Sequence, residues 1–192
     1  MNTVQKKQLD HSNPQEALAD LCEGFFEDRS WVSSCEAVEA DDIPQPAREL
    51  LVHHKHMTAT LKAHYGQDVA LTVLAESSEG DQYTRTILLT LPSRGDVVEF
   101  GIARLDLRFT DEEVRAAILG RAAPLGAILI GHRVLTKVTP KWYLRFPADC
   151  PVMTYFGQPP IEAYGRLATI QCNGDAAVEL LEVVPGASRF KP

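Results

Sequence analysis

Two arginines lie inside stretches of the chain that otherwise have the pattern of core β-strands. Arg85 belongs to the alternating stretch Gln82–Leu91, and Arg104 belongs to a second stretch that runs from about Val97 to Phe109. An arginine that faces a core must be paired or must bind something, because burying an unpaired charge is costly. A guanidinium group matches a carboxylate with two parallel hydrogen bonds and stays charged when buried. We therefore predict that Arg85 holds an organic carboxylate in an internal pocket.

The same residues also allow a purely structural interpretation. In it, Arg85 forms an ion pair across the sheet with a glutamate on a neighbouring strand. Arg104 and Arg166 are then plain surface charges, and Met57 fills the core. The sequence alone leaves this alternative open.

Histidines and cysteines raise the question of a metal site. His53, His54, His56 and His64 lie close together, but no carboxylate or cysteine lies within the stretch that they span. Since a zinc site needs such a set of ligands at suitable spacing, we expect solvated or capping histidines and no metal. The four cysteines are widely spaced and contain no CxxC pair, which favours free thiols in a cytoplasmic protein.

Composition limits the classes of function. The chain has 192 residues, of which 45% are hydrophobic and 23% charged, so we expect one soluble globular domain over residues 1–192. The net charge of -7 argues against a protein that binds nucleic acid or a membrane surface in a general way. No apolar run is long enough to span a membrane, and the N-terminus lacks the apolar core of a secretory signal. We expect a small-molecule ligand, while the sequence does not indicate an oligomeric state.

Capping signals and one apolar run predict four helical regions. Asn13 followed by Pro14 and Glu16 is typical of a helix start, and Pro46 opens a weaker helical stretch that ends at Gly66. Thr110 with Glu113 predicts a helix that ends at Gly120, and a short apolar helix follows from Pro124.

Strand signals complete the predicted fold. They are Val69–Glu76, the two arginine-bearing strands around a turn at 92–95, Arg133–Phe146 with a bulge at Pro140, and two strands at 163–172 and 176–184 around Asn173-Gly174. These six strands predict an α+β fold with one largely antiparallel sheet and helices in two excursions. Residues 28–45 are expected to be an irregular connection, 150–160 a loop or lid, and 1–12 and 186–192 loose termini.

Four short motifs follow one another in a distinctive order. They are HMT at 56–58, QYTRTILL at 82–89, PLG at 124–126, and a C-terminal set made of YGR at 164–166, Asn173-Gly174 and a last strand with glutamates before Pro185. Their order and spacing, over roughly residues 46–185, resemble the chorismate lyase family (chorismate pyruvate-lyase, 4-hydroxybenzoate synthase). The first 45 residues do not contribute to this resemblance.

The resemblance implies a lyase that converts chorismate to 4-hydroxybenzoate and pyruvate without a metal or cofactor, for ubiquinone biosynthesis or a related aromatic pathway. It implies that Arg85 pairs with the ring carboxylate, with help from the backbone amides of Met57 and Leu125. It also implies that a glutamate on the last strand contacts the ring hydroxyl. Arg104 and Lys137 are candidates for the second carboxylate of the substrate.

The last strand offers two glutamates for the hydroxyl contact. Glu182 and Glu179 lie on opposite faces of a regular strand, so only one of them points into the pocket, and we favour Glu182. This choice requires a one-residue slip near the strand end relative to the family pattern, of the kind that a bulge gives. Ala103 replaces a glycine that is frequent in the family, which narrows the expected pocket.

Two other functions agree with the same motifs. The fold also resembles the effector-binding domain of bacterial transcription regulators, which bind small acids or sugars without catalysis. Residues 1–45 are too short and too acidic for the winged helix-turn-helix that such regulators carry, so this alternative would be a solitary sensor of aromatic acids. An enzyme acting on a related cyclohexadiene acid is the third possibility.

Overall fold

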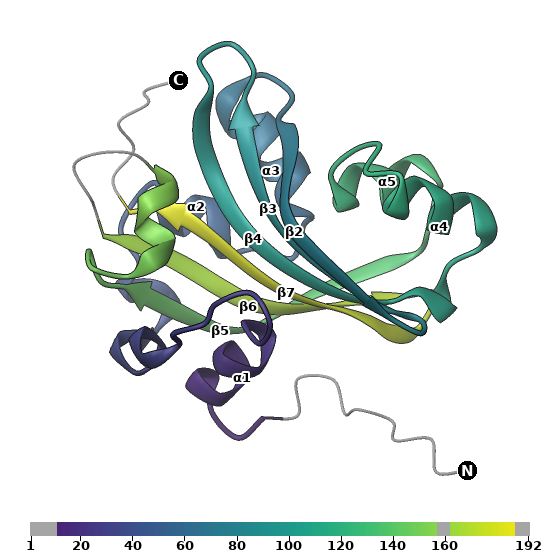
Figure 1. Cartoon of the computed structure of the whole chain (residues 1–192). Coiled ribbons are helices and arrows are strands. Elements are labelled where there is room, and N and C mark those ends of the chain that lie inside the picture. The colour runs from purple at the N-terminus through teal and green to yellow at the C-terminus, as the bar shows by residue number, and fades with distance from the viewer. Residues whose placement is uncertain (1–10, 157–161, 187–192) are drawn as a thin grey trace, which may run out of the picture.

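One antiparallel sheet of seven strands, in the order β1-β5-β6-β7-β4-β3-β2, organises this α+β protein (Figure 1). The computed structural model describes residues 11–156 and 162–186. The strands are β1 Glu36–Val38, β2 Ala70–Glu79, β3 Gln82–Leu91, β4 Asp96–Asp106, β5 Thr136–Phe146, β6 Ala163–Cys172 and β7 Asp175–Pro185. The α-helices are α1 Pro14–Leu21, α2 Ala47–Leu51, α3 Met57–Tyr65, α4 Glu112–Leu119 and α5 Leu125–Gly131.

The central hairpin confirms the strand prediction around Arg85. β3 has the predicted bounds Gln82–Leu91, and Gly95 closes the turn with a φ of 75°. β4 is shorter than predicted, because its last residue is Asp106. The Asp106 carboxylate accepts a hydrogen bond from the Arg108 backbone N–H and turns residues 107–109 into a 3-10 helix.

The C-terminal strands also follow the sequence signals. Asn173 and Gly174 have positive φ values of 53° and 98°, as a tight hairpin turn between β6 and β7 requires. The pairing of β5 with β6 shifts register between Pro140 and Trp142, which confirms the bulge that the proline predicts.

A seventh strand corrects the prediction of six. β1 lies within residues 28–45, which we expected to be irregular, and it pairs with β5 from Glu36 opposite Arg145 to Val38 opposite Tyr143. Its three residues are too few to show the alternation that marks a strand in a sequence.

The helix starts are confirmed for α1 and corrected for α4. The Asn13 side chain accepts a hydrogen bond from the Glu16 N–H at 2.9 Å, as predicted. In α4 the cap is Asp111, which accepts from the Val114 N–H at 2.9 Å, rather than Thr110. The Thr110 hydroxyl instead donates to the Leu107 carbonyl at 2.7 Å, because Thr110 ends the preceding 3-10 turn. The expected helical stretch from Pro46 divides into α2 and α3, and Gly66 ends it with a φ of 68°.

Helices cover the two faces of the sheet unequally. One face packs against α1 and two 3-10 segments, 30–34 and 151–156, through a core that includes Phe100, Leu181 and Met153. The other face carries one core under α2 and α3 and a second core under α4 and α5. Figure 1 shows α4 and α5 at the right-hand end of the sheet and α1 below it.

The predicted lid segment lies on the α1 face as far as it is described. Residues 151–156 contact β4, and the Tyr155 ring stacks on Phe100 with ring centroids 5.1 Å apart. This part of the segment therefore covers a core rather than a ligand pocket. Residues 157–161 of the predicted lid, and most of the termini predicted to be loose, lie outside the described residues.

Candidate active site

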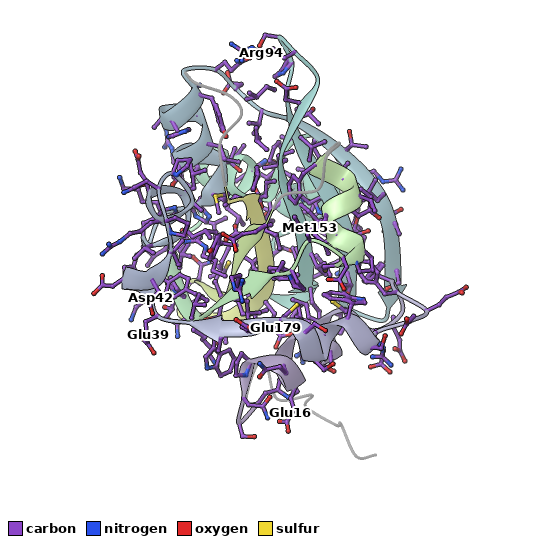
Figure 2. The ribbon with its side chains drawn as sticks, turned by 90° about the vertical axis from the view of Figure 1, so that its left-hand side faces the viewer. Glu16, Glu39, Asp42, Arg94, Met153 and Glu179 are labelled. Atoms are coloured by element: carbon purple, nitrogen blue, oxygen red, sulfur yellow. The ribbon has the colours of Figure 1, made fainter. Side chains whose placement is uncertain are left out.

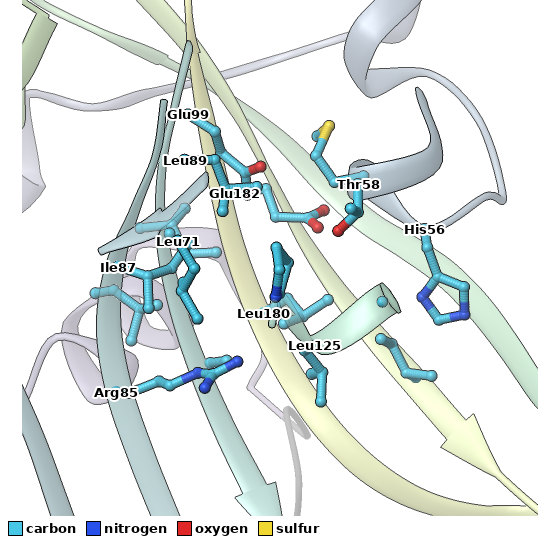
Figure 3. A pocket seen from close by; sticks show the side chains of 18 residues that line it. His56, Thr58, Leu71, Arg85, Ile87, Leu89, Glu99, Leu125, Leu180 and Glu182 are labelled. Atoms are coloured by element: carbon cyan, nitrogen blue, oxygen red, sulfur yellow. The ribbon is translucent and has the colours of Figure 1, made fainter. Parts of the chain in front are cut away.

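A cavity lies between the two cores that share one face of the sheet. Its walls come from β2, β3, β4, β6 and β7 and from the first residues of α3 and α5. The space between the lining atoms is about 490 Å³, including the part that opens to solvent. Figure 3 shows Arg85 at one end of this space and Glu99 and Glu182 at the other (Figure 3). The lining residues are His56, Met57, Thr58, Leu71, Arg85, Ile87, Leu89, Glu99, Gly101, Ile102, Ala103, Pro124, Leu125, Gly126, Ile170, Leu180, Leu181 and Glu182.

The floor of the cavity consists of residues that lie side by side on β3, β4 and β7, and the strand register sets which residues are neighbours. Arg85 lies opposite Ala103, and Ala103 lies opposite Leu180 on the next strand. Gly101 lies opposite Glu182, one row further along the same face. Arg85 and Glu182 are thus two strands apart, about 10 Å, and two residues apart along the strands, about 7 Å. Their side chains reach toward one space from two sides, which suits a small ring with polar groups at both ends.

Arg85 is buried without an anionic partner among the described residues. Its side chain is 2% exposed, and Nη1 has no hydrogen-bond partner within the described chain. Burial lowers the pKa of Arg85, and Tyr83 and Glu76 oppose that shift, but a guanidinium keeps its charge at any ordinary pH. The alternative of a structural ion pair between Arg85 and a strand glutamate is therefore wrong for this part of the chain.

Glu182 is paired instead with Arg166, a fully buried cation on β6. The Arg166 Nε donates to Glu182 Oε2 at 2.5 Å. The same guanidinium donates to the backbone carbonyls of Leu51, His53 and Lys55 at 3.0, 2.9 and 3.2 Å. Arg166 is 0% exposed, so the alternative that it is a surface charge is wrong. It anchors both the Glu182 carboxylate and the loop that leads into α3.

Glu179 points to the opposite face, as strand alternation requires. It is 2% exposed and pairs with Arg104 at 3.0 Å, while Arg104 also donates to the Asp20 carboxylate at 2.6 Å. Figure 2 labels Glu179 between the middle of the molecule and α1, the helix that carries Glu16 (Figure 2). Arg104 therefore belongs to a structural cluster under α1, and the idea that it serves a second substrate carboxylate is wrong. Lys137 is exposed on β5 and does not line the cavity, so it does not fill that role either.

Glu99 is a cavity residue that the sequence analysis did not single out. It is 3% exposed, and its Oε2 has no hydrogen-bond partner in the described part of the chain. Burial raises the pKa of the Glu99 carboxyl well above its ordinary value, the nearby Glu182 raises it further, and Arg166 lowers it. The carboxyl group at this position therefore keeps its proton to a higher pH than an ordinary glutamate does. The sequence could have indicated this position, because Glu99 lies two residues before Gly101 and four before Ala103 and so shares their face of β4.

Replacing Glu99 by glutamine is expected to stabilise the protein more at pH 8 than at pH 5. Between the unfolded-state pKa of about 4.3 and the raised folded-state pKa, only the folded protein keeps this proton, so stability falls as pH rises. The loss is at most about 1.4 kcal/mol per pH unit. Glutamine does not titrate and removes that slope. Urea unfolding of both proteins at the two pH values measures the difference, and an equal gain at both would contradict a neutral Glu99.

Two helix starts form the wall opposite the sheet. Met57 and Leu125 are the first residues of α3 and α5, where backbone amides have no partner inside the helix. The two helices come close at Gly126, where a Cβ atom would meet the His56 Cβ at 2.9 Å and the Thr58 Oγ1 at 3.2 Å. Both helix starts therefore line the cavity together, and Met57 also belongs to the core under α2 and α3.

Gly126→Ala is expected to destabilise the protein by about 1–3 kcal/mol, because the added methyl group forces α5 away from α3. Gly131→Ala in the same helix is the matched control, since a Cβ atom there meets nothing within 4 Å. We expect the control to be neutral or up to about 1 kcal/mol stabilising. Urea unfolding curves measure both changes, and equal stability of the two variants would show that the helix approach is not tight.

Ring nitrogens of His53, His54 and His56 lie within hydrogen-bond distance of other protein groups. His56 Nε2 lies 2.8 Å from Thr136 Oγ1, His53 Nε2 lies 2.7 Å from the Leu50 carbonyl, and His54 Nδ1 lies 3.1 Å from the Val138 carbonyl. Burial lowers the pKa of both His53 and His56, and Arg166 adds to this effect. In the described ranges, no group of three or more histidine, cysteine or acidic side chains is arranged to hold a metal ion. All four cysteines are buried free thiols.

None of the described helices has the length and apolar character needed to cross a membrane. The chain matches no known family model, and it matches no curated protein sequence.

Proposed function

We propose that this protein is a chorismate lyase, which releases pyruvate from chorismate and leaves 4-hydroxybenzoate in the cavity. The observation that supports this most is a buried, unpaired Arg85 guanidinium facing a carboxyl pair across one small cavity. All four motifs that resemble the chorismate lyase family contribute residues to that cavity, and the fourth also supplies Arg166, which anchors Glu182.

The proposed reaction needs few groups from the protein. Chorismate carries a ring carboxylate, a ring hydroxyl and an enolpyruvyl ether. The ether C–O bond breaks, the hydrogen on the hydroxyl-bearing carbon leaves, and the enolpyruvyl carbon gains a proton, so that pyruvate and the aromatic ring form without net oxidation. Aromatisation drives this step, so the protein must mainly select one conformer and exclude water.

Each end of the substrate has a matching group. Arg85 binds the ring carboxylate with its two-pronged donor geometry, and the first amides of α3 and α5 lie in the wall beside the ring. Glu182, held in place by Arg166, accepts the hydrogen bond of the ring hydroxyl and serves as the base. The floor between them is mostly apolar and includes Ile87, Gly101 and Leu180.

The experiment is to incubate the purified protein with chorismate and to follow pyruvate and 4-hydroxybenzoate by chromatography. We expect both products to appear in equal amounts, faster than in a protein-free sample. Absence of product above the protein-free rate rejects the lyase. If chorismate or 4-hydroxybenzoate then still raises the unfolding temperature, the protein is an acid-binding module of the same fold.

A further inference from the structure

Glu99 adds a second carboxyl group to the end of the cavity that faces Arg85. Glu99 lies on β4 opposite Leu89, and Glu182 lies on β7 opposite Gly101. The two glutamates are thus one strand apart, about 5 Å, and two residues apart along the strands, about 7 Å. Figure 3 shows both side chains directed toward the same space.

Gly101 lies on the floor of the cavity, opposite Glu182 and two residues from Glu99. A Cβ atom at Gly101 would lie 3.4 Å from the Glu99 Oε1 and 3.2 Å from two Ile87 side-chain atoms. The contact with Glu99 would be an ordinary van der Waals contact, whereas the Ile87 side chain would have to shift by a few tenths of an ångström. The bare backbone at this point leaves the space above Gly101 open to a ligand.

The two carboxyl groups differ in their partners. Glu182 accepts from the charged Arg166 and is the natural carboxylate of the pair. Glu99 is buried with an oxygen that has no protein partner in the described residues, and a lone buried carboxylate is far more costly than a neutral carboxyl group. One end of the cavity therefore offers a proton acceptor and a proton donor side by side.

We propose that Glu99 is a substrate-contacting residue whose neutral carboxyl group donates a hydrogen bond to the hydroxyl oxygen of a cyclic hydroxy acid, while Glu182 accepts the proton of that same hydroxyl. This inference rests on the proposed function for the direction in which the ligand lies, with its carboxylate on Arg85. A hydroxyl group is the substituent that satisfies both glutamates, because it donates and accepts at one atom. The ligand class is then a ring acid with a hydroxyl opposite the carboxylate.

The charged and titratable groups around Glu99 agree with this assignment. Glu182 and Arg166 come from the neighbouring strands β7 and β6, and His53 and His56 come from the loop before α3. Burial holds the pKa of both histidines below its ordinary value, so neither supplies a positive charge that would ionise Glu99. Arg85 lies at the far end of the cavity.

Two substitutions separate a donor from an acceptor. Glu99→Gln keeps the shape and an N–H donor, whereas Glu99→Leu keeps the approximate volume and removes all hydrogen bonding. Titration calorimetry with 4-hydroxybenzoate and with benzoate measures what each variant loses. We expect Glu99→Leu to weaken the binding of 4-hydroxybenzoate by about tenfold and the binding of benzoate by less than about twofold. We expect Glu99→Gln to stay within about threefold of wild type for both ligands.

Several outcomes overturn the assignment. It fails if Glu99→Leu keeps the wild-type ratio of the two affinities, or if wild type binds neither acid. It also fails if Glu99→Gln loses as much as Glu99→Leu, because Glu99 would then act as an ionised acceptor. Thermal unfolding of each variant verifies the fold; Glu99→Leu removes a buried carboxyl group with an unpartnered oxygen, whereas Glu99→Gln replaces it with an amide of the same shape.

The chorismate assay separates this inference from the proposed function. A wild-type protein that forms no pyruvate but shows the Glu99-dependent preference for 4-hydroxybenzoate rejects the lyase and keeps the hydroxyl site. An active lyase whose variants show no such preference rejects the role of Glu99 alone.

Discussion

Arg85→Ala is expected to weaken binding of 4-hydroxybenzoate by about 30- to 1,000-fold. The substitution removes a charge-assisted, two-pronged contact worth roughly 2–4 kcal/mol in a buried site. The Arg85 guanidinium has an unpartnered nitrogen inside the cavity, so its removal costs the described protein no ion pair. Within the protein, Arg85 interacts with Tyr83 and Glu76, so the loss of affinity is measured separately from any loss of stability. Titration calorimetry measures the affinity, and urea unfolding measures the stability.

Two further variants make this test specific. Arg85→Lys keeps the charge but not the planar fork, so we expect it to recover only a small part of the affinity. Arg94→Ala removes the same charge from the exposed tip of the same hairpin and should change the affinity by less than about twofold. An Arg85→Ala protein that folds and binds 4-hydroxybenzoate as tightly as wild type would remove Arg85 from the site.

Glu182→Gln is expected to lower the turnover of chorismate by about 10²-fold or more, within the usual range for a lost acid or base. Glutamine preserves the shape of the side chain and removes the carboxylate that accepts the hydrogen bond of the ring hydroxyl. Single-turnover rates at saturating chorismate measure the chemical step apart from binding. If the rate of Glu182→Gln stays within threefold of wild type, Glu182 is not the base, and catalysis then depends on conformer selection and on Arg85.

Glu179→Gln is the matched control, on the same strand and with the same change of atoms. Glu179 faces the α1 side, where it pairs with Arg104 at 3.0 Å, so we expect turnover within about threefold of wild type. Because this pair is buried, we also expect lower stability, which urea unfolding reveals. The reverse pattern, with turnover lost in Glu179→Gln, would assign the catalytic role to the other face of the sheet.

Local patterns predicted most of the sheet because they act within a few residues. The alternation of β3, the bulge at Pro140 and the turn at Asn173-Gly174 follow from sterics and short-range hydrogen bonds. The choice of Glu182 over Glu179 also agrees with the side of the sheet that holds the cavity. The slip expected near the end of β7 is absent from its pairing with β4, which stays in register from Val178 to Val183.

Features that depend on distant partners were beyond the sequence. β1 exists because it pairs with β5, more than 100 residues away. Arginine is usually a surface residue. Arg166 is buried because the loop at 51–55 packs over it and accepts its hydrogen bonds, which the sequence does not show. Glu99 needed the strand register to be known before its position beside Glu182 became visible. The cap of α4 moved by one residue because Asp111 and Thr110 are both good caps in isolation.

The multiple contacts of Arg166 have a consequence for how variants of this cavity respond. Its cation is shared between one side chain, Glu182, and three backbone carbonyls of the loop before α3. Loss of the side-chain partner leaves the three carbonyl acceptors in place, so the start of α3 keeps its position when Glu182 is changed. Substitution of Glu182 removes the anionic partner of Arg166 but leaves its carbonyl contacts, whereas substitution of Arg166 removes the contacts to the loop and to Glu182 at once. Redesign of the cavity end near Glu182 and Glu99 can therefore change these two glutamates, while Arg166 is kept because it holds the loop before α3 in place.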